Sequence, residues 1–538
     1  MMRGILASME RGDFSYWGYI VKRCVRLWPL VLLMGGISLS LGYFLMLPDD
    51  YENLSESVIA SNLFANNVLA CITTRNYWDI VNTYKPLMHT WYLGVLMQMY
   101  IVLPLIIIIS NKLSHNNRNV LKNLLIIITL ASVAAYILPL ATAAAKFYYL
   151  PYRAFEMTAG GLIAFIPQQR VKKFFALEVI CLLILIGMLC IHSNILHSSV
   201  KLIITCCATV YLLFIFQNTE DHFPSIASIL ALLGKCSFSI YLCHQVVVAF
   251  MYYNVTNKIN IVTFVVFAFI VILFSALCYN FVEKPIGIIA KDKKKEGIIF
   301  VSCLAICLVL SGISGYIYSK AGVVRDIPEF GITTTNVHRG MHKNYSDRPY
   351  KWDVDFTDSE KTKIIVIGNS FGRDWANVLA ESGIADQLEI SYIYPHSYEY
   401  IMERENRIQK ADYVFYVLGP GYHDIPEYVQ KCIPSMEKLY VVGNKNYGES
   451  NGIIYSRRNR SNYFELAVKV PDDLLKQNEQ MKQKYGDNFV DLLSYVEKGN
   501  GYVRIFTPEH KFISQDCRHL TQYGAQYYAK ALDQLWKR

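Results

Sequence analysis

Charged residues are scarce in this chain. Only 18% of its 538 residues are Asp, Glu, Lys or Arg, against about 25% in ordinary soluble domains, whereas 53% are hydrophobic. Acidic residues are rarest in residues 1–321, which hold 24 Lys and Arg but 14 Asp and Glu, a net charge of +10; residues 322–538 carry a net charge of −1. This composition excludes a wholly soluble enzyme, a disordered chain and a coiled coil as descriptions of the whole protein.

Other common signals are also missing. The first 27 residues are polar, so we expect no secretory signal peptide. Only two of the 13 cysteines, Cys432 and Cys517, lie after residue 321, which excludes a disulfide framework and leaves open whether these two pair or are free thiols. The His, Cys, Asp and Glu residues show no metal-ligand spacing, so we expect no metal and no bound cofactor. The basic excess lies between apolar runs, which argues against a nucleic-acid partner.

Apolar runs fill the first part of the chain. A helix needs about 20 apolar residues to cross a bilayer, and only helices satisfy their own backbone polar groups there. The sequence therefore predicts an α-helical membrane bundle of about nine spans over roughly 27–47, 90–110, 121–140, 152–167, 176–193, 200–217, 236–253, 260–282 and 298–319. The shorter run 57–71 contains three asparagines and favours a partial or re-entrant helix.

Basic residues on alternate loops orient these predicted spans. Lys22 precedes the first span, Lys112 and Arg118 follow the second, Arg170 follows the fourth and Lys293 follows the eighth. If the spans alternate, all of these residues fall on one side, which the positive-inside rule makes the cytoplasm. Nine crossings would then leave the C-terminal part outside, in the periplasm or its equivalent.

The last part of the chain alternates short β-branched runs with helical patterns, which is typical of a three-layer α/β domain. The predicted strands are 363–367, 388–393, 412–418, 438–442 and 502–506, and the predicted helices include 373–381 and 521–537. We therefore expect three regions: a membrane domain over 1–320, a polar linker over 321–360 and an α/β domain over 361–538.

Three residues of the α/β domain suggest nucleophilic catalysis. Ser370 follows a predicted strand and precedes a helix, so its hydroxyl would be exposed on a sharp turn with backbone N–H groups nearby. Asp516 and His519 are three residues apart before the last helix and can orient one another toward one serine. This pattern predicts Ser370 as nucleophile, His519 as base and Asp516 as the group that orients the base. The alternative is that Ser370 only caps a helix.

Ionisable side chains also occur in the apolar part. Arg23 and Arg26 lie three apart at the mouth of the first span, where they suit a phosphate-bearing ligand or simply anchor the helix. Arg153 and Glu156 lie within an apolar stretch and can pair as an (i, i+3) couple, for function or for structure alone.

Polar residues mark two further spans. His89 opens the predicted second span, in the run H-T-W-Y over 89–92. Tyr241 and His244 lie three apart along the seventh span. His244 taken by itself fits a hydrogen-bonded core histidine as readily as a functional one.

Five motifs in residues 22–285 resemble those of the acyltransferase-3 membrane family, and they occur in the family's order. They are K-R-C-V-R-L-W-P (22–29), H-T-W-Y-L-G-V-L-M-Q-M-Y (89–100), R-A-F-E-M-T-A-G-G (153–161), G-K-C-S-F-S-I-Y-L-C-H (234–244) and F-V-E-K-P (281–285).

This resemblance implies transfer of an acyl group, usually acetyl from cytoplasmic acetyl-CoA, to a glycan across the membrane. It implies that Arg23 and Arg26 hold the CoA phosphates. Four further residues would line the transfer path with His89, namely Arg153, Glu156, Tyr241 and His244. Family members normally carry two more helices before the first motif, one with a histidine thought to be catalytic, so a subunit that supplies them is a conceivable partner.

The α/β domain resembles SGNH-type hydrolases, in which G-D-S opens the domain and D-x-x-H closes it. Here Asn369 replaces the usual Asp. The resemblance implies Gly419 as an oxyanion-hole residue and Asn444 as a loose substitute for the family's asparagine. Acyltransferase-3 helices joined to such a domain occur in O-acetyltransferases of surface polysaccharides. The expected activity is therefore O-acetylation of an envelope polysaccharide such as O-antigen or capsule. The alternatives are a glycan O-acetyl esterase anchored by a degenerate bundle, and a non-catalytic partner subunit of a membrane acyltransferase.

Overall fold

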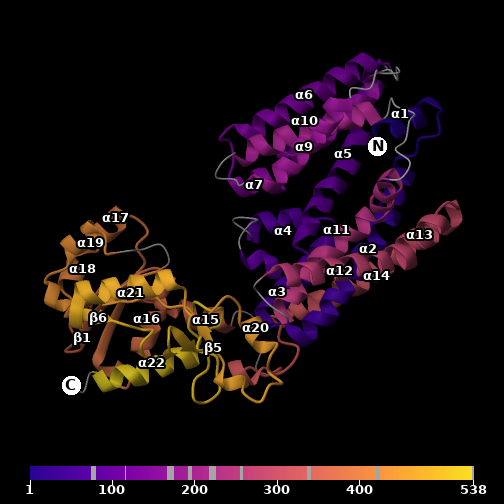
Figure 1. Ribbon diagram of the computed structural model, residues 1–538. Helices are drawn as coiled ribbons and strands as arrows, with labels where there is room; N and C mark the ends of the chain where they lie inside the picture. The colour runs from indigo at the N-terminus through magenta and orange to yellow at the C-terminus, as the bar shows by residue number, and fades with distance from the viewer. Residues whose placement is uncertain are drawn as a thin grey trace. The chain divides into compact units, whose positions relative to one another are not determined.

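The computed structural model describes residues 1–73, 80–115, 117–166, 175–191, 197–216, 226–254, 259–335, 341–419 and 424–535. Arg170, used above to orient the spans, lies outside these ranges. The chain forms two compact units (Figure 1): the first comprises Met1–Phe44 and Asn53–Tyr318, and the second comprises Leu45–Glu52 and Ser319–Arg538.

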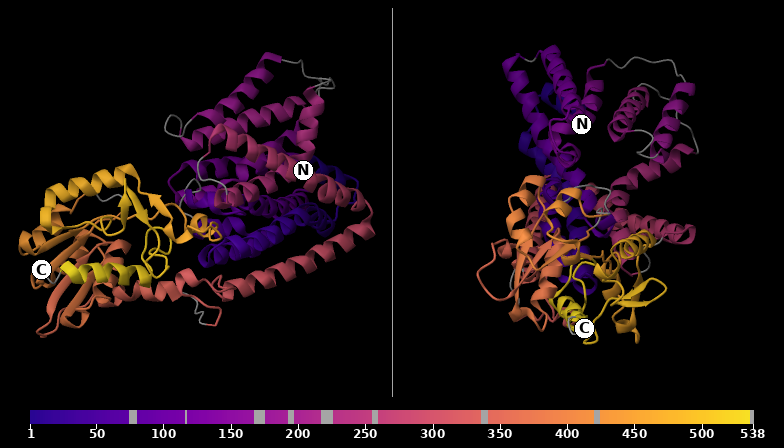
Figure 2. Two further views of the ribbon diagram at one scale, coloured as in Figure 1. Left: turned by 60° about the horizontal axis from the view of Figure 1, so that its bottom comes forward. Right: turned by 90° about the vertical axis from the view of Figure 1, so that its left-hand side faces the viewer.

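The first unit is entirely helical in its described residues. Its helices are α1 (Met2–Glu10), α2 (Tyr16–Leu45), α3 (Pro48–Asn62), α4 (Asn66–Thr73), α5 (Trp91–Leu113), α6 (Arg118–Ile137), α7 (Ala143–Tyr148), α8 (Ala154–Leu162), α9 (Phe175–Cys190), α10 (Ser198–Phe216), α11 (Ile226–Asn254), α12 (Ile261–Cys278), α13 (Lys284–Ile289) and α14 (Lys293–Ser319), with the single turns η1 (Ile80–Tyr84), η2 (Met88–Thr90) and η5 (Tyr279–Glu283). Figure 2 shows the long helices of this unit, coloured indigo to pink, from two further sides.

Seven helical stretches of the described residues are long and apolar enough to cross a membrane: Tyr16–Leu45, Met88–Leu113, Arg118–Ile137, Ser198–Ile215, Leu233–Asn254, Ile261–Ile289 and Lys293–Ser319. Large apolar side chains stand exposed on several of them, such as Phe264 and Phe269 on α12 and Ile298 and Leu308 on α14. A bilayer, in contrast to water, offers such side chains an apolar surrounding.

The structure differs from the nine predicted spans at two places. The predicted span 152–167 corresponds to a short helix over Ala154–Phe165, and the predicted span 176–193 corresponds to α9, which has 16 residues over Phe175–Cys190. Neither has the length of about 20 residues that a crossing needs. The run 57–71, predicted to be partial or re-entrant, divides between α3 and α4, with Phe64 in a left-handed conformation (φ 53°) at the break.

The second unit is built around a parallel sheet. Its five strands are arranged in the order β2 (Leu388–Ile393), β1 (Thr362–Ile367), β3 (Tyr413–Val417), β4 (Leu439–Val442) and β6 (Phe489–Val490), and all neighbours run parallel. The run 502–506, predicted as a strand, forms β8 (Tyr502–Arg504) in a separate antiparallel sheet with β5 (Ala467–Lys469) and β7 (Glu497–Gly499). A strand this short and half exposed joins an edge sheet more readily than a buried centre.

Helices cover both faces of the parallel sheet because its strands are apolar on both faces. Ile364 and Val366 face the layer that contains α16 (Ser370–Ala380) and α22 (Gln522–Leu535). Ile365 and Ile367 face the layer that contains α17 (Tyr398–Met402), α18 (Glu405–Gln409), α19 (Glu427–Cys432) and α21 (Asp472–Tyr485). The result is a three-layer arrangement (Figure 1), in which the loops that follow β1, β3 and β4 meet at one sheet edge.

Residues before the sheet also belong to this unit. The stretch 321–360, expected to be a polar linker, contributes the buried side chains of Val323, Ile327 and Phe330 to a core cluster. Leu47, from the short segment between α2 and α3, packs in the same cluster. Gly322 (φ 72°) passes so close to this segment that an added Cβ would lie 1.9 Å from the Pro48 carbonyl oxygen, so only glycine fits there.

A partly buried group of ion pairs joins the segment before β1 to α17 and α18. Asp353 accepts hydrogen bonds from Arg404 (Nε–Oδ1 3.0 Å), from Arg407 and from the Tyr400 hydroxyl. Burial alone raises the pKa of Asp353, but these donors outweigh it and lower the pKa to about 2. A carboxyl whose pKa is lowered by folding adds stability at pH values above its pKa in the unfolded chain, which is near 4. This stability is lost as the pH falls toward 2.

We therefore expect Asp353→Asn to lower the unfolding free energy of the second unit by about 2 kcal/mol at pH 7. The difference from wild type should shrink as the pH drops from 4 to 2. Thermal unfolding at pH 7 and pH 3 measures this. The exposed Asp386→Asn is the matched control and should change nothing. Equal loss at both pH values would contradict the electrostatic explanation.

Candidate functional site

Ser370, His519 and Asp516 form a continuous hydrogen-bonded chain in the second unit. The Ser370 Oγ lies 2.8 Å from His519 Nε2, and His519 Nδ1 lies 2.6 Å from Asp516 Oδ2. The structure thus brings Ser370 together with two residues that lie 146 and 149 positions later in the sequence. A serine, an imidazole and a carboxylate in this order can deprotonate the hydroxyl for attack on an acyl carbon.

The serine occupies the turn between β1 and α16. Asn369 caps α16, because its side-chain oxygen accepts from the Phe371 N–H at 2.9 Å. The Tyr392 hydroxyl lies 2.9 Å from the carbonyl oxygens of both Gly368 and Asn369, which ties this turn to β2. Asn369, which stands where hydrolases of the resembled type carry Asp, therefore has a structural task at the start of the helix.

The histidine loop is equally constrained. The Asp516 carboxylate accepts the backbone N–H groups of Arg518 and His519 as well as the imidazole. Burial raises the pKa of Asp516, but these hydrogen bonds together lower the pKa below its ordinary value and keep the group ionised. The loop turns at Cys517, which has a φ of 68°. The His519 carbonyl accepts from the Ser514 hydroxyl at 2.7 Å.

A buried ion pair that sequence reasoning missed underlies this loop. Asp374, one turn after Ser370, accepts the Leu520 N–H at 2.9 Å and the Lys445 ammonium at 2.9 Å. The side chains of Asp374 and Lys445 are only 2% and 1% exposed. Burial lowers the pKa of Lys445, and the Asp374 carboxylate opposes that shift. The Lys445 Nζ also lies 3.7 Å from the centroid of the Phe371 ring, which packs edge-on against His519.

The two predicted oxyanion residues are placed differently. Gly419 follows β3 and lies against Asn369: a Cβ at residue 419 would meet the Asn369 amide nitrogen at 2.2 Å, so only glycine allows this approach next to Ser370. Asn444 follows β4 and is buried, and its side-chain oxygen accepts from the Lys445 N–H at 3.0 Å. The Asn478 side chain accepts a hydrogen bond from the Asn444 N–H and donates one to the Asn444 carbonyl.

The cysteine question is also answered in the second unit. Cys432 and Cys517 are both free thiols. Cys432 packs in the core on the α17–α19 side of the sheet and Cys517 in the core on the α22 side. Burial raises the pKa of Cys517, which keeps this thiol protonated beside the Asp516 carboxylate.

In the first unit, His89 meets the two candidates on α11. Its ring centroid lies 5.1 Å from those of both Tyr241 and His244, and the Tyr241 hydroxyl donates to the His89 carbonyl. His89 is 3% exposed, and among the described residues neither of its ring nitrogens has a hydrogen-bond partner. A buried imidazole without partners is unusual in a purely structural role, so this trio is the best-supported chemical group of the bundle.

Arg153 and Glu156 form the ion pair that their spacing predicts. The Arg153 Nη1 lies 2.7 Å from Glu156 Oε1, and Arg153 Nε donates to the Phe147 carbonyl at 2.9 Å. The Trp91 ring lies 5.6 Å from the Arg153 guanidinium, and the Tyr92 hydroxyl donates to Glu156. Trp91 and Tyr92 directly follow the turn that carries His89. The Arg153–Glu156 ion pair therefore positions the start of α5.

Arg23 and Arg26 differ in their surroundings. The Arg23 guanidinium lies 4.8 Å from the Tyr19 ring centroid and 5.1 Å from that of Tyr100. Arg26, one turn later on α2, is exposed. Arg23, which stacks on aromatic rings, and the exposed Arg26 together form a basic pair near the start of the first candidate span.

Comparison with known families decides how the first unit is classified. Residues 1–280, about half of the chain, match the family model described as "Acyltransferase domain". The chain belongs to this acyltransferase family. The matched part holds all seven residues predicted for the donor and transfer path, from Arg23 to His244.

Several curated proteins are similar to this chain. They include "Putative O-acetyltransferase SACOL0978" of Staphylococcus aureus strain COL (24% identical, 53% of this chain and 48% of that protein). "O-acetyltransferase OatA" of S. aureus strain NCTC 8325 is also 24% identical, over 49% of this chain and 46% of its own. An uncharacterized protein of Haemophilus influenzae is 23% identical over 45% of this chain and 91% of its own. The chain spans about half the length of the staphylococcal relatives, and no solved structure matches it.

Proposed function

We propose that this acyltransferase O-acetylates an envelope polysaccharide with acetyl-CoA as donor. The observation that carries the proposal is the hydrogen-bonded chain Ser370–His519–Asp516 in a protein whose first unit belongs to an acyltransferase family. The names of the staphylococcal relatives support oxygen as the acceptor atom. The chain would reside in a bacterial inner membrane, with its second unit on the extracytoplasmic side and the basic start of α2 on the cytoplasmic side.

In this scheme the two units act in sequence. Acetyl-CoA binds at the cytoplasmic side, where Arg23 and Arg26 pair with its phosphates. At the His89, Tyr241 and His244 trio the acetyl group passes from the thioester to the hydroxyl of a carrier alcohol, and CoA leaves as the thiol with the proton of that hydroxyl. The scheme uses no metal, and acetyl-CoA enters it as a substrate rather than as a bound cofactor.

The second unit would complete the transfer through an acyl-enzyme. The Ser370 Oγ attacks the carbonyl carbon of the acetylated carrier alcohol while His519 Nε2 takes the serine proton, and the carrier leaves as the free alcohol with that proton. A sugar hydroxyl then attacks the ester, gives its proton to His519, and Ser370 regains it as the acetylated sugar departs. The Gly419 N–H lies at the sheet edge where an oxyanion would form, and Asp516 holds the imidazole in the required tautomer.

The direct experiment uses membranes that contain the full chain. Radiolabelled acetyl-CoA supplied to the cytoplasmic face should label base-labile esters on the membrane's polysaccharide, and membranes without the chain should not. Absence of labelled ester in membranes with verified protein would refute acetyl transfer by this chain alone. If a co-purifying subunit then restored labelling, the chain would be one part of a two-part enzyme.

An esterase is the second candidate, because the serine triad is complete within the second unit and needs no donor. In that case acetylated polysaccharide would release acetate without CoA, and the amount released would not fall when acetyl-CoA is added. Acetyl transfer to sugar that exceeds acetate release to water would exclude it.

The donor site gives a separate prediction. Arg26→Gln should weaken acetyl-CoA binding about 5-fold, because an exposed charge-assisted contact is worth about 1 kcal/mol. Isothermal titration of the solubilised protein with CoA measures this. Lys22→Gln, an equally exposed cation on the same helix, is the control and should bind normally. Unchanged affinity in Arg26→Gln would remove this residue from the donor site.

A further inference from the structure

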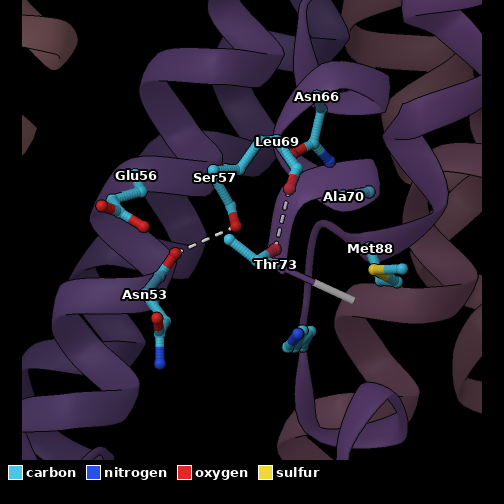
Figure 3. Close-up of a pocket in the computed structure, with 9 residues that line it drawn as sticks. Asn53, Glu56, Ser57, Asn66, Leu69, Ala70, Thr73 and Met88 are labelled. Carbon is cyan, nitrogen blue, oxygen red and sulfur yellow. Dashed lines mark hydrogen bonds between the residues drawn. The ribbon is translucent and has the colours of Figure 1, made fainter. Parts of the chain in front are cut away.

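A polar hollow between α3, α4 and the turn before α5 is too small to hold a sugar (Figure 3). Its volume is about 20 Å³, which is room for a single water molecule. Met88 lies on its wall, and two of its polar side chains already have partners: Ser57 donates to the Asn53 carbonyl and Asn66 to the Leu87 carbonyl, each at 2.9 Å. The glycan of the proposed reaction therefore needs a different surface, near the serine at which its hydroxyl reacts.

Three neighbouring aromatic rings of the second unit offer such a surface. The Tyr350 ring centroid lies 6.3 Å from that of Tyr394, which lies 4.5 Å from that of His396. We call these three rings the aromatic strip. Tyr350 is 43% exposed, His396 is exposed and Tyr394 is half-buried. The strip therefore presents ring surface to the solvent instead of packing wholly into the core.

The strip begins beside the turn that carries the nucleophile. The Tyr350 ring packs against Tyr392, with centroids 5.6 Å apart. The Tyr392 hydroxyl lies 2.9 Å from the carbonyl oxygens of Gly368 and Asn369, the two residues directly before Ser370. One buried ring thus separates Tyr350 from the backbone of the nucleophile turn.

The other two rings lie at the same edge of the parallel sheet. The Gly368 N–H donates to the Ile393 carbonyl at 3.2 Å, so the carboxyl ends of β1 and β2 are paired. Ser370 follows the first of these strand ends, and Tyr394 and His396 follow the second. Ligands of open α/β sheets bind outside the carboxyl ends of the strands, so the strip occupies the edge at which a substrate of Ser370 must lie.

Tyr350 is held in place by its neighbours on the turn η7 (Arg348–Trp352). Arg348 donates to Glu381 at 2.8 Å, and Asp347 accepts from Arg373 at 2.6 Å, so both residues before the turn's exposed ring are fixed to α16. Burial raises the pKa of Tyr350, and the nearby Arg373 guanidinium opposes that shift. A ring that is already ordered loses little freedom when a ligand stacks on it.

The chemistry of the strip suits a sugar. A sugar ring has an apolar face of C–H groups that packs on an aromatic ring, and hydroxyls that bond to the polar tips of tyrosine and histidine. Because Arg348 and Arg373 are paired with carboxylates, a phosphate-bearing group would find these two cations already engaged. A neutral stretch of glycan fits the surface better than an anionic donor.

We propose that the aromatic strip is a glycan subsite, which binds the sugar residues next to the one that reacts at Ser370. The inference rests on the proposed function and names the direction in which the polysaccharide leaves the nucleophile, over the carboxyl end of β2. One neighbouring sugar stacks on Tyr350, and the next reaches His396. The protein therefore prefers an oligosaccharide to a single sugar.

Protection of His396 tests this binding without turnover. Diethyl pyrocarbonate modifies exposed histidines, and peptide mass spectrometry of the full chain reads residue 396. The probes are cellotetraose, chitotetraose and isomaltotetraose, with the methyl glycosides of glucose and N-acetylglucosamine as single-sugar comparisons. We expect at least one tetrasaccharide to slow modification of His396 about 5-fold or more, and the methyl glycosides less than about 2-fold. His510, exposed elsewhere in the second unit, should react at a constant rate.

Variants of Tyr350 show whether the ring carries the binding. Tyr350→Ala should abolish protection of His396 by the tetrasaccharide, whereas Tyr350→Phe keeps the ring and should retain it. Tyr502→Ala is the matched control, because it removes a tyrosine of the same exposure (44%) on β8. In this control the tetrasaccharide should protect His396 as in wild type.

Kinetics with the protecting tetrasaccharide as acceptor give a second readout. Tyr350→Ala should raise the KM for the tetrasaccharide about 5-fold, because a stacked ring contributes binding and no chemistry. The kcat and the KM for acetyl-CoA should change less than about 2-fold. Tyr350→Phe should stay close to wild type in all three constants.

The outcomes separate the subsite from the transferase. Three results would overturn the subsite: modification of His396 that no tetrasaccharide slows, equal protection by the methyl glycosides, or protection that survives Tyr350→Ala. Protection that is lost in Tyr350→Ala, in a protein without acetyl transfer, would keep the subsite and refute the transferase. Acetyl transfer with an unchanged KM for the tetrasaccharide in Tyr350→Ala would keep the transferase and remove the subsite.

Discussion

Replacing Ser370 with alanine is expected to abolish acetylation of the polysaccharide, with a fall of at least about 10³-fold in the rate of the second unit's reaction. The reason is that the alanine has no oxygen to carry the acetyl group, and triad residues act as a unit. A fluorophosphonate probe should label wild type at Ser370 and leave Ser370→Ala unlabelled. Ester content of the polysaccharide, released with base, gives the second measurement.

His519→Asn tests the same hydrogen-bonded triad at its base. The asparagine cannot take the serine proton, so probe labelling should fall to the level of Ser370→Ala although the serine remains. Ser494→Ala, an exposed serine elsewhere in the second unit, should be labelled and active as wild type. Unchanged polysaccharide acetylation in Ser370→Ala would sink the catalytic role of the triad and leave the serine as a helix cap.

Replacing Lys445 with methionine is expected to destabilise the second unit by about 2 kcal/mol, because it removes the ammonium that contacts the buried Asp374 carboxylate at 2.9 Å and leaves only Arg373, whose Nη2 lies 3.6 Å from Asp374 Oδ1. Thermal unfolding of the solubilised protein measures the loss. Hydrogen exchange should show where it arises: the Leu520 amide, which donates to Asp374, should exchange faster. Probe labelling of Ser370 should slow, since the same loop carries His519.

A double variant separates charge from packing. In Lys445→Met with Asp374→Asn the buried charge is gone, and the asparagine oxygen still accepts the Leu520 N–H. We expect it to recover half or more of the lost stability. A double variant as unstable as the sum of the single ones would show that the two residues act independently. Lys484→Met, a partly exposed lysine on α21, is the control for a general loss of charge.

Much of the architecture could be predicted from local patterns. The β-branched run 363–367 predicted β1, because such residues favour a buried strand. The turn at Gly368 predicted where this strand ends and therefore where Ser370 lies. The same logic succeeded for β2, β3 and β4. The strand predicted over 502–506 is present as β8, over Tyr502–Arg504, but strand content alone does not say which sheet a strand joins, and β8 pairs antiparallel with β5 and β7.

The candidate site was only partly visible in the sequence. An aspartate and a histidine three residues apart before the last helix have few roles other than catalysis, so the sequence could predict the triad. The structure brings its three residues together. Lys445 and Asp374 could not be found, because a lysine after a strand and an aspartate in a helix usually lie at the surface. Only the three-dimensional structure shows that they are buried together under the histidine loop.

Hydropathy likewise predicted where helices occur better than how long they are. The runs 152–167 and 176–193 are apolar enough for spans, yet the helical stretch in the first ends at Phe165 and α9 in the second has 16 residues. The hollow beside Met88 escaped prediction altogether. Its residues come from two helices and a turn, and their proximity depends on how α3 folds back along α2.

The place of Leu47 in the core of the second unit bears on the history of this chain. A module gained by a single fusion event carries its own core, whereas this one shares a core residue with a segment some 270 positions upstream. A second unit exchanged between relatives at a single junction near residue 319 would therefore lack Leu47 in this core. Recombination that preserved folding would have to carry residues 45–52 together with the C-terminal half.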